Sequence, residues 1–158
     1  MTSLFPLIIL AVVVVISLGL RGKLAAKTAA LHGDALDQVR ALLAPRAADE
    51  SSPLIVVGTE RKRLSATVYY VGVTSHRLAL YQPGGETQVV DRRAVRMSMK
   101  PKTWADIGNM QTIHSSGWEL VLQLGDRSHT LRVYELATAA YPDHPAQIRA
   151  LAATLAAA

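Results

Sequence analysis

The side chains best suited to metal binding or acid–base chemistry in this chain are five histidines. They are His32, His76, His114, His129 and His144. No two of them lie three or four residues apart and none belongs to an H-E-x-x-H motif, so the spacing of a helical zinc site is absent. We therefore expect solvated or capping histidines, with no metal and no cofactor.

The sequence also lacks the nucleophiles and phosphate-binding loops of common enzymes. It has no cysteine, which excludes thiolate catalysis and disulfides. Ser115-Ser116-Gly117 is not a G-x-S-x-G nucleophile elbow, and no Walker A or dinucleotide-binding motif occurs. Three of the twelve acidic residues directly precede an arginine, as in Asp91-Arg92. Two carboxylates meeting across the fold of a small hydrolytic or transfer enzyme are an alternative, but we expect a non-catalytic protein.

Basic side chains form two clusters, which are the candidate binding residues. Lysine and arginine outnumber aspartate and glutamate by 17 to 12, a formal net charge of +5. This excess favours acidic partners but is too small for a nucleic-acid-binding protein, so we expect no nucleic acid. The clusters are Arg61-Lys62-Arg63 and, further along, Arg92, Arg93, Arg96, Lys100 and Lys102. Near an anionic leaflet each cation contributes about 1 kcal/mol, enough together to orient a tethered domain.

Trp104 is counted with these clusters as a candidate contact for lipid or protein. It lies between Lys102 and Asp106 in a polar stretch, where an aromatic ring suits a membrane interface or a partner surface. Trp118 instead opens an alternating apolar segment and is expected in the core. The alternative for the basic clusters is that they are solvated charge on the rim of the fold.

The elements that position these residues begin with a hydrophobic segment. Residues 4–20 carry no charge, and a helix of this length, rising about 1.5 Å per residue, reaches most of the way across a hydrocarbon core of about 30 Å. Arg21, Lys23 and Lys27 follow it, whereas residues 1–3 include no basic side chain, the opposite of a secretory signal.

We therefore predict a transmembrane anchor over residues 1–22. The positive-inside rule places the N-terminus outside the cell membrane and the remainder on the cytoplasmic side, as in a single-pass protein. A cleaved signal and a buried soluble helix are the alternatives.

Residues 23–53 are expected to form a juxtamembrane helix and a linker. Leu36, Val39, Leu42 and Leu43 share one helical face, and Pro45 should end the helix. This face packs on the chain's own domain or at the membrane interface, or alternatively it docks a partner helix.

From residue 54 the apolar residues alternate, which predicts a mainly β domain over residues 54–158. Strands are expected at 54–57, 64–73, 78–81, 118–124 and 130–134, and residues 87–99 supply one more strand or two. Arg61-Lys62-Arg63 is expected in the first turn, Gly84-Gly85 in another, and a hairpin at Gly125 to Ser128. Residues 100–116 are expected to be a long loop, with an extra strand at 110–114 as an option. Ile148, Leu151, Ala152 and Leu155 follow the spacing of a C-terminal amphipathic helix.

Two segments carry a resemblance to a known family. Thr74-Ser75-His76-Arg77-Leu78-Ala79-Leu80-Tyr81 resembles the T-x-x-R-L-hydrophobic hairpin of bacterial pleckstrin-homology-like (PH-like) domains, and Val89 to Val95 is similar to the strand and turn that follow it. The resemblance covers roughly residues 54–155. It implies an antiparallel β-barrel of about seven strands capped by a C-terminal helix, with Arg61-Lys62-Arg63 where lipid-binding members hold phosphates.

These patterns together predict a non-catalytic single-pass membrane protein. Its cytoplasmic PH-like domain would bind another protein at the membrane, as an accessory subunit of a membrane complex, because tethering raises the effective concentration for membrane partners. The first alternative is binding of anionic lipid headgroups by the basic loops.

Overall fold

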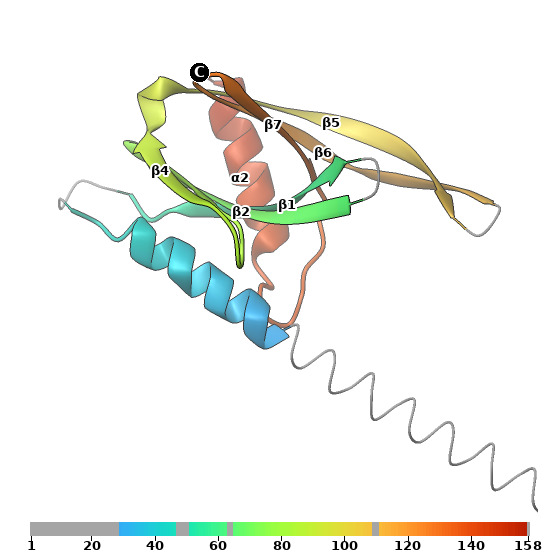
Figure 1. Cartoon of the computed structure of the whole chain (residues 1–158), viewed down its shortest axis with the longest axis horizontal. Helices are drawn as coiled ribbons and strands as arrows, with labels where there is room; N and C mark the ends of the chain where they lie inside the picture. Colours follow the sequence, from blue (N-terminus) through green and yellow to red (C-terminus); the bar gives the residue numbers. More distant parts are fainter. Residues whose placement is uncertain (1–28, 47–50, 63–64, 109–110, 158) are drawn as a thin grey trace, which may run out of the picture.

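The computed structural model describes residues 29–46, 51–62, 65–108 and 111–157, which form one open β-sheet with a helix on each face (Figure 1). The predicted anchor at residues 1–22 lies outside these ranges, as does Arg63. Within the described residues no helix is both long enough and apolar enough to cross a membrane.

The sheet is built from seven antiparallel strands. They are β1 (Leu54–Lys62), β2 (Ser65–Val73), β3 (Arg77–Tyr81), β4 (Thr87–Asp91), β5 (Val95–Gly108), β6 (Gln111–Leu124) and β7 (Arg127–Val133), with the 3-10 helix η1 (Arg92–Ala94) and the helix α2 (His144–Ala156). Their order in the sheet is β4-β3-β2-β1-β7-β6-β5. The prediction of seven antiparallel strands followed by a C-terminal helix is confirmed. The sheet is open, because β4 and β5 are its two edges and do not pair.

Two predictions about polar segments are wrong: the end of the first strand and the loop at residues 100–116. The first strand continues past Gly58 to Lys62, so Arg61 pairs with Ala66 inside the ladder instead of lying in a turn. The predicted loop at residues 100–116 is a long hairpin, because β5 and β6 pair without a break from Val95–Leu124 to Gly108–Gln111. Sequence alternation fails there because this arm extends beyond the end of β7 and most of its described side chains are exposed.

The inner face of the sheet packs on α2. Ile148 and Leu151 of α2 are completely buried against alternate residues of the strands, and Leu155 packs at the edge of the same core. The β6–β7 hairpin turns at Gly125, whose φ of 58° lies in the left-handed region that glycine tolerates. Both the predicted helix stripe and the predicted hairpin are therefore confirmed.

The outer face is covered by a helix at residues 29–42 (Figure 1). Ala35, Leu36, Val39 and Leu43 are buried there against Ile55, Tyr70, Ala79 and Tyr141. The expected apolar face thus packs on the chain's own sheet. The guanidinium of Arg77 on β3 donates to the carbonyl oxygens of Leu42 (3.3 Å) and Ala44 (2.7 Å), which satisfies groups left open where the helix ends.

Gly72 allows this helix to approach β2 closely. A Cβ atom at position 72 would lie 2.5 Å from Cγ1 of Val39 and 2.5 Å from Cδ1 of Leu43, inside van der Waals contact. The helix and the strand therefore fit only because β2 has no side chain at this point.

We expect Gly72→Ala to lower the free energy of unfolding by about 1–3 kcal/mol, because the helix must shift to relieve the clash. Urea denaturation of a fragment spanning residues 29–158 measures this. Gly33→Ala is the control: position 33 is helical and has open space around it, so alanine should raise stability by about 0.5–1 kcal/mol. Equal stability of Gly72→Ala and the wild type would contradict this packing.

His144 is part of the structural framework, contrary to the expectation of a solvated or capping histidine. Its side chain is buried, Nε2 accepts a hydrogen bond from the N–H of Val57 (3.0 Å), and Nδ1 donates to the carbonyl oxygen of Leu136 (3.2 Å). These two bonds fix the neutral ring, since a protonated ring cannot accept from Val57. Burial lowers the pKa of His144, and burial likewise lowers the pKa of His32, whose Nδ1 lies 2.6 Å from the Tyr70 hydroxyl.

Acidification should therefore destabilise the fold. With the folded-state pKa of His144 below the ordinary value of 6.5, the unfolded chain binds more protons, so stability is complete above pH 6.5 and falls as the pH drops below it. Urea midpoints between pH 7.5 and pH 5 test this. His144→Gln should make the profile less steep at lower overall stability, with the slope from His32 remaining, and exposed His76→Gln should keep the wild-type profile. Stability that rises on acidification in the wild type would contradict the assignment.

Candidate functional site

The structure divides the predicted basic residues into those that have an acidic partner and those that do not. On β1, Nη1 of Arg61 lies 2.6 Å from Oδ1 of Asp106, and Nζ of Lys62 lies 3.8 Å from Oε2 of Glu60. Asp106 also binds Arg132 at 2.9 Å, so one carboxylate joins β5 to β1 and β7. The two described residues of the first cluster, Arg61 and Lys62, are therefore paired with carboxylates of the sheet.

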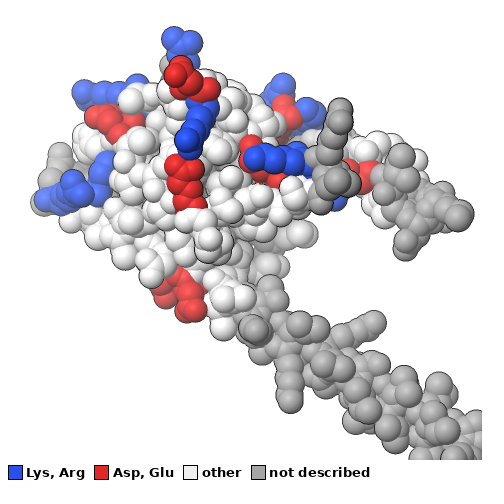
Figure 2. All heavy atoms as spheres, viewed as in Figure 1, with Lys and Arg blue, Asp and Glu red and all other residues white. Residues whose placement is uncertain are grey.

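Two of the five residues in the second cluster, Lys100 and Lys102, are neutralised in the same way. Lys100 lies 3.3 Å from Glu119, and Lys102 donates a hydrogen bond to the same carboxylate. Glu119 is buried, and the hydrogen bond from Lys102, followed by that from Lys100, lowers its pKa. Figure 2 shows this pattern more widely: most Lys and Arg on the face in view lie beside an Asp or Glu.

Trp104 is buried, so its selection as an exposed contact is wrong. Only 8% of the residue is exposed; the ring packs edge-on against Tyr134 with centroids 5.4 Å apart, and the Arg132 guanidinium lies 5.2 Å from its centroid. The cause is the long hairpin, in which Trp104 belongs to a strand and turns toward β7. Trp118 is half-buried, and its Nε1 donates to Glu135 at 2.7 Å.

Three arginines at the corner between β4 and β5 form the remaining candidate, which we call the arginine turn: Arg92, Arg93 and Arg96. Among the described residues no carboxylate lies within ion-pair distance of their guanidinium groups. The backbone of the turn is well fixed. Asp91 accepts from the N–H of Arg93 (2.8 Å), and the N–H of Arg92 donates to the carbonyl oxygen of His76 (2.8 Å).

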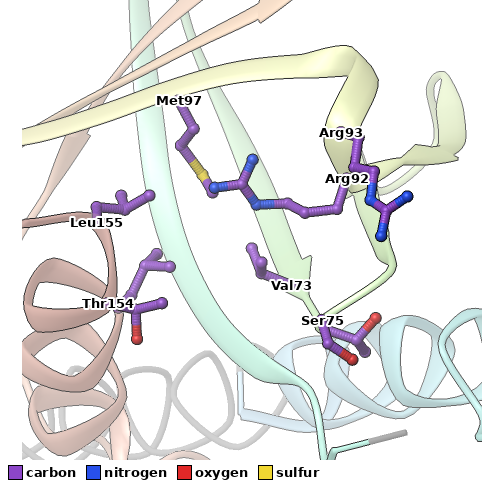
Figure 3. Close-up of a pocket in the computed structure, with 9 residues that line it drawn as sticks. Val73, Ser75, Arg92, Arg93, Met97, Thr154 and Leu155 are labelled. Atoms are coloured by element: carbon purple, nitrogen blue, oxygen red, sulfur yellow. The ribbon is translucent and has the colours of Figure 1, made fainter. Parts of the chain in front are cut away.

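A groove of about 330 Å³ lies beside the arginine turn. Its floor is apolar and combines Val73 of β2, Met97 of β5, and Leu151 and Leu155 of α2, while Thr74, Ser75, Arg92, Arg93 and Thr154 supply its polar atoms. Figure 3 shows the side chain of Arg92 reaching across toward Met97, whereas that of Arg93 turns away. The groove thus has an apolar base and a guanidinium at its mouth.

This arrangement suits the binding of an anionic group. Guanidinium groups stay protonated at neutral pH and donate several hydrogen bonds in one plane, which matches a carboxylate or phosphate. Among the described residues no group of three histidine, aspartate or glutamate side chains is placed to hold a metal ion.

Sequence reasoning selected the arginines but missed the groove. Its walls come from β2, β5 and α2, segments more than 20 residues apart along the chain, and each apolar wall residue was explained by the core pattern alone. The local signal in the sequence was the pair Arg92-Arg93 in a turn. Two adjacent positive charges make the local potential positive, which favours the binding of an anion.

The chain matches no family model, no curated protein and no solved structure.

Charge removal should separate the two kinds of basic residue. We expect Lys102→Gln to lower the free energy of unfolding by about 0.5–1 kcal/mol, because Glu119 loses its main hydrogen-bond donor while Lys100 still compensates part of the charge. Arg96→Gln should change stability by less than about 0.5 kcal/mol, as at surface positions without partners. Urea denaturation of both variants gives the comparison. Equal losses would show that Arg96 also has a structural role.

Proposed function

We propose that the chain is a non-catalytic, single-pass membrane protein whose cytoplasmic PH-like domain binds another protein through the arginine turn. The observation that carries this proposal is the contrast in charge pairing. Arg61, Lys62, Lys100 and Lys102 all form ion pairs with carboxylates, whereas the guanidinium groups of the three arginines at the β4–β5 corner form none among the described residues, and Asp91 in the same turn binds the backbone of Arg93.

The topology supports the PH-like part of the proposal. β1 to β4 and β5 to β7 each follow one another as antiparallel neighbours, β1 lies beside β7, and a C-terminal helix packs on the inner face. This is the arrangement that the resemblance at Thr74 to Tyr81 implies, with the difference that the sheet is open between β4 and β5.

The position of the turn supports a protein partner over the leaflet. His32, near the start of the 29–42 helix, contacts Tyr70, whereas Arg77 binds the last carbonyl groups of the helix and the neighbouring His76 binds Arg92. The helix rises about 15 Å between His32 and Leu42. A tether that enters at residue 29 therefore holds the arginine turn at the far end of the helix from the point of attachment.

The surface around the turn is also suited to a protein. β4 is an edge strand with no strand neighbour on its outer side, and Val89 on it is 40% exposed. Edge strands and exposed apolar side chains are common docking points for other chains. An acidic segment lying along β4 would reach Arg93.

Co-isolation of the full chain from native membranes in mild detergent tests the proposal. We expect a partner that copurifies with the wild type and is lost, at least tenfold, from the double variant Arg93→Gln with Arg96→Gln. The matched control is Arg40→Gln with Arg149→Gln, which removes the same charge from two arginines that lie outside the turn and are paired with carboxylates, and it should retain the partner.

Two outcomes would contradict the proposal. A chain that always purifies alone argues against a protein complex. Binding of a 29–158 fragment to anionic vesicles that falls steeply with salt, and is lost in the Arg93 and Arg96 double variant, would favour lipid headgroups instead. The fragment starts at residue 29 because a later cut would remove part of the helix that covers the sheet.

A further inference from the structure

We propose that the groove beside the arginine turn binds a single-chain aliphatic carboxylate, with the chain on the apolar floor and the carboxylate on Arg92. This inference concerns a small ligand and does not depend on the protein partner proposed above. It uses the inward-reaching Arg92, whereas the protein contact uses Arg93 and Arg96.

The floor of the groove is suited to a hydrocarbon chain. Val73 and Leu151 are buried, and Met97 and Leu155 are half-buried around them, so the base presents methyl and methylene groups from three elements. The hydroxyl of Thr154 donates to the carbonyl oxygen of Ala150 (2.9 Å). The donor of this hydroxyl is therefore already satisfied on the α2 side of the groove.

The size of the groove limits the ligand. A volume of about 330 Å³ lies at the lower end of the range of about 300–1,000 Å³ found for small-molecule sites. It accommodates one short aliphatic chain and excludes the paired chains of a membrane phospholipid. The ligand class is therefore a monoacyl compound.

Arg92 is placed to bind the headgroup. Its Nη1 donates to the carbonyl oxygen of Val95 (3.1 Å), which fixes the side chain across the mouth of the groove, as Figure 3 shows. A guanidinium carries five N–H donors, and the other donors of Arg92 have no acceptor among the hydrogen bonds of the described residues. A carboxylate there gains charge-assisted hydrogen bonds in the planar geometry that guanidinium favours.

The competing explanation is that the positive charge of Arg92 stabilises the C-terminal end of α2. The last turn of this helix, which includes Thr154 and Leu155, borders the groove, and its exposed carbonyl groups attract a cation. Under that explanation removal of Arg92 affects stability alone and leaves ligand affinity unchanged, so the two roles are separable by experiment.

The test uses the full chain in lipid nanodiscs, labelled with ¹³C at the methionine methyl groups and titrated with octanoate. The methyl signal of Met97, assigned with Met97→Leu, should shift and saturate. Arg92→Gln should weaken octanoate binding at least tenfold, and Arg149→Gln, which removes the same charge from an arginine paired with Glu135 outside the groove lining, should leave it unchanged. Thr154→Trp, which fills the groove from the exposed side of α2, should abolish the shift without removing a charge.

Neutral and phosphorylated probes complete the test. Octanol should bind at least tenfold more weakly than octanoate, and equal affinities would overturn the role of Arg92. Tighter binding of octyl phosphate than of octanoate would overturn the assignment to a carboxylate. The chain has four methionines. If all their methyl signals shifted linearly with octanoate concentration and never reached saturation, octanoate would be partitioning into the bilayer, and the site would be overturned. A lower melting temperature of Arg92→Gln with unchanged octanoate affinity would assign Arg92 to α2.

Discussion

The close approach of the 29–42 helix to β2 at Gly72 is the contact on which the rest of the arrangement depends. Without a Cβ atom at this position, Val39 and Leu43 reach the backbone of the strand and bury the outer face of the sheet. The sheet is then covered on both sides, as its apolar outer residues require. Because Arg77 closes the same helix, the segment after the predicted anchor and the sheet are one packed unit.

Pairing of charges decides where this basic chain can bind an acidic ligand. A net charge of +5 by itself locates nothing, since every surface lysine or arginine contributes to it. Asp106 and Glu119 neutralise basic residues on β1, β5 and β7. In the part of the chain that the structure describes, the β4–β5 corner therefore carries three guanidinium groups without an ion pair, beside the single carboxylate of Asp91.

Much of the fold follows from local sequence patterns. Alternation identified the β-rich domain, Gly125 the last hairpin, and the spacing of Ile148, Leu151 and Leu155 the final helix, because each of these signals is contained in a short stretch. The β5–β6 hairpin was not predicted, because its outer half lies beyond β7 and needs no apolar face. The burial of Trp104 was not predicted for a related reason: it depends on contacts with Arg132 and Tyr134, which are distant in the sequence. The groove likewise needs three separate elements in place before it exists.

The two proposed ligands meet at one short turn, and the sign of their coupling follows from electrostatics. Arg92 and Arg93 are neighbours in η1, so a carboxylate held by Arg92 lowers the positive potential that an acidic protein segment senses at Arg93. Screening acts over about 8 Å at physiological salt, and it weakens this coupling because both sites are open to water. Ligand binding in the groove should thus weaken protein binding at the turn, and by reciprocity the protein should weaken the ligand equally. A groove ligand would then act as a competitor by charge alone, without occupying the protein contact.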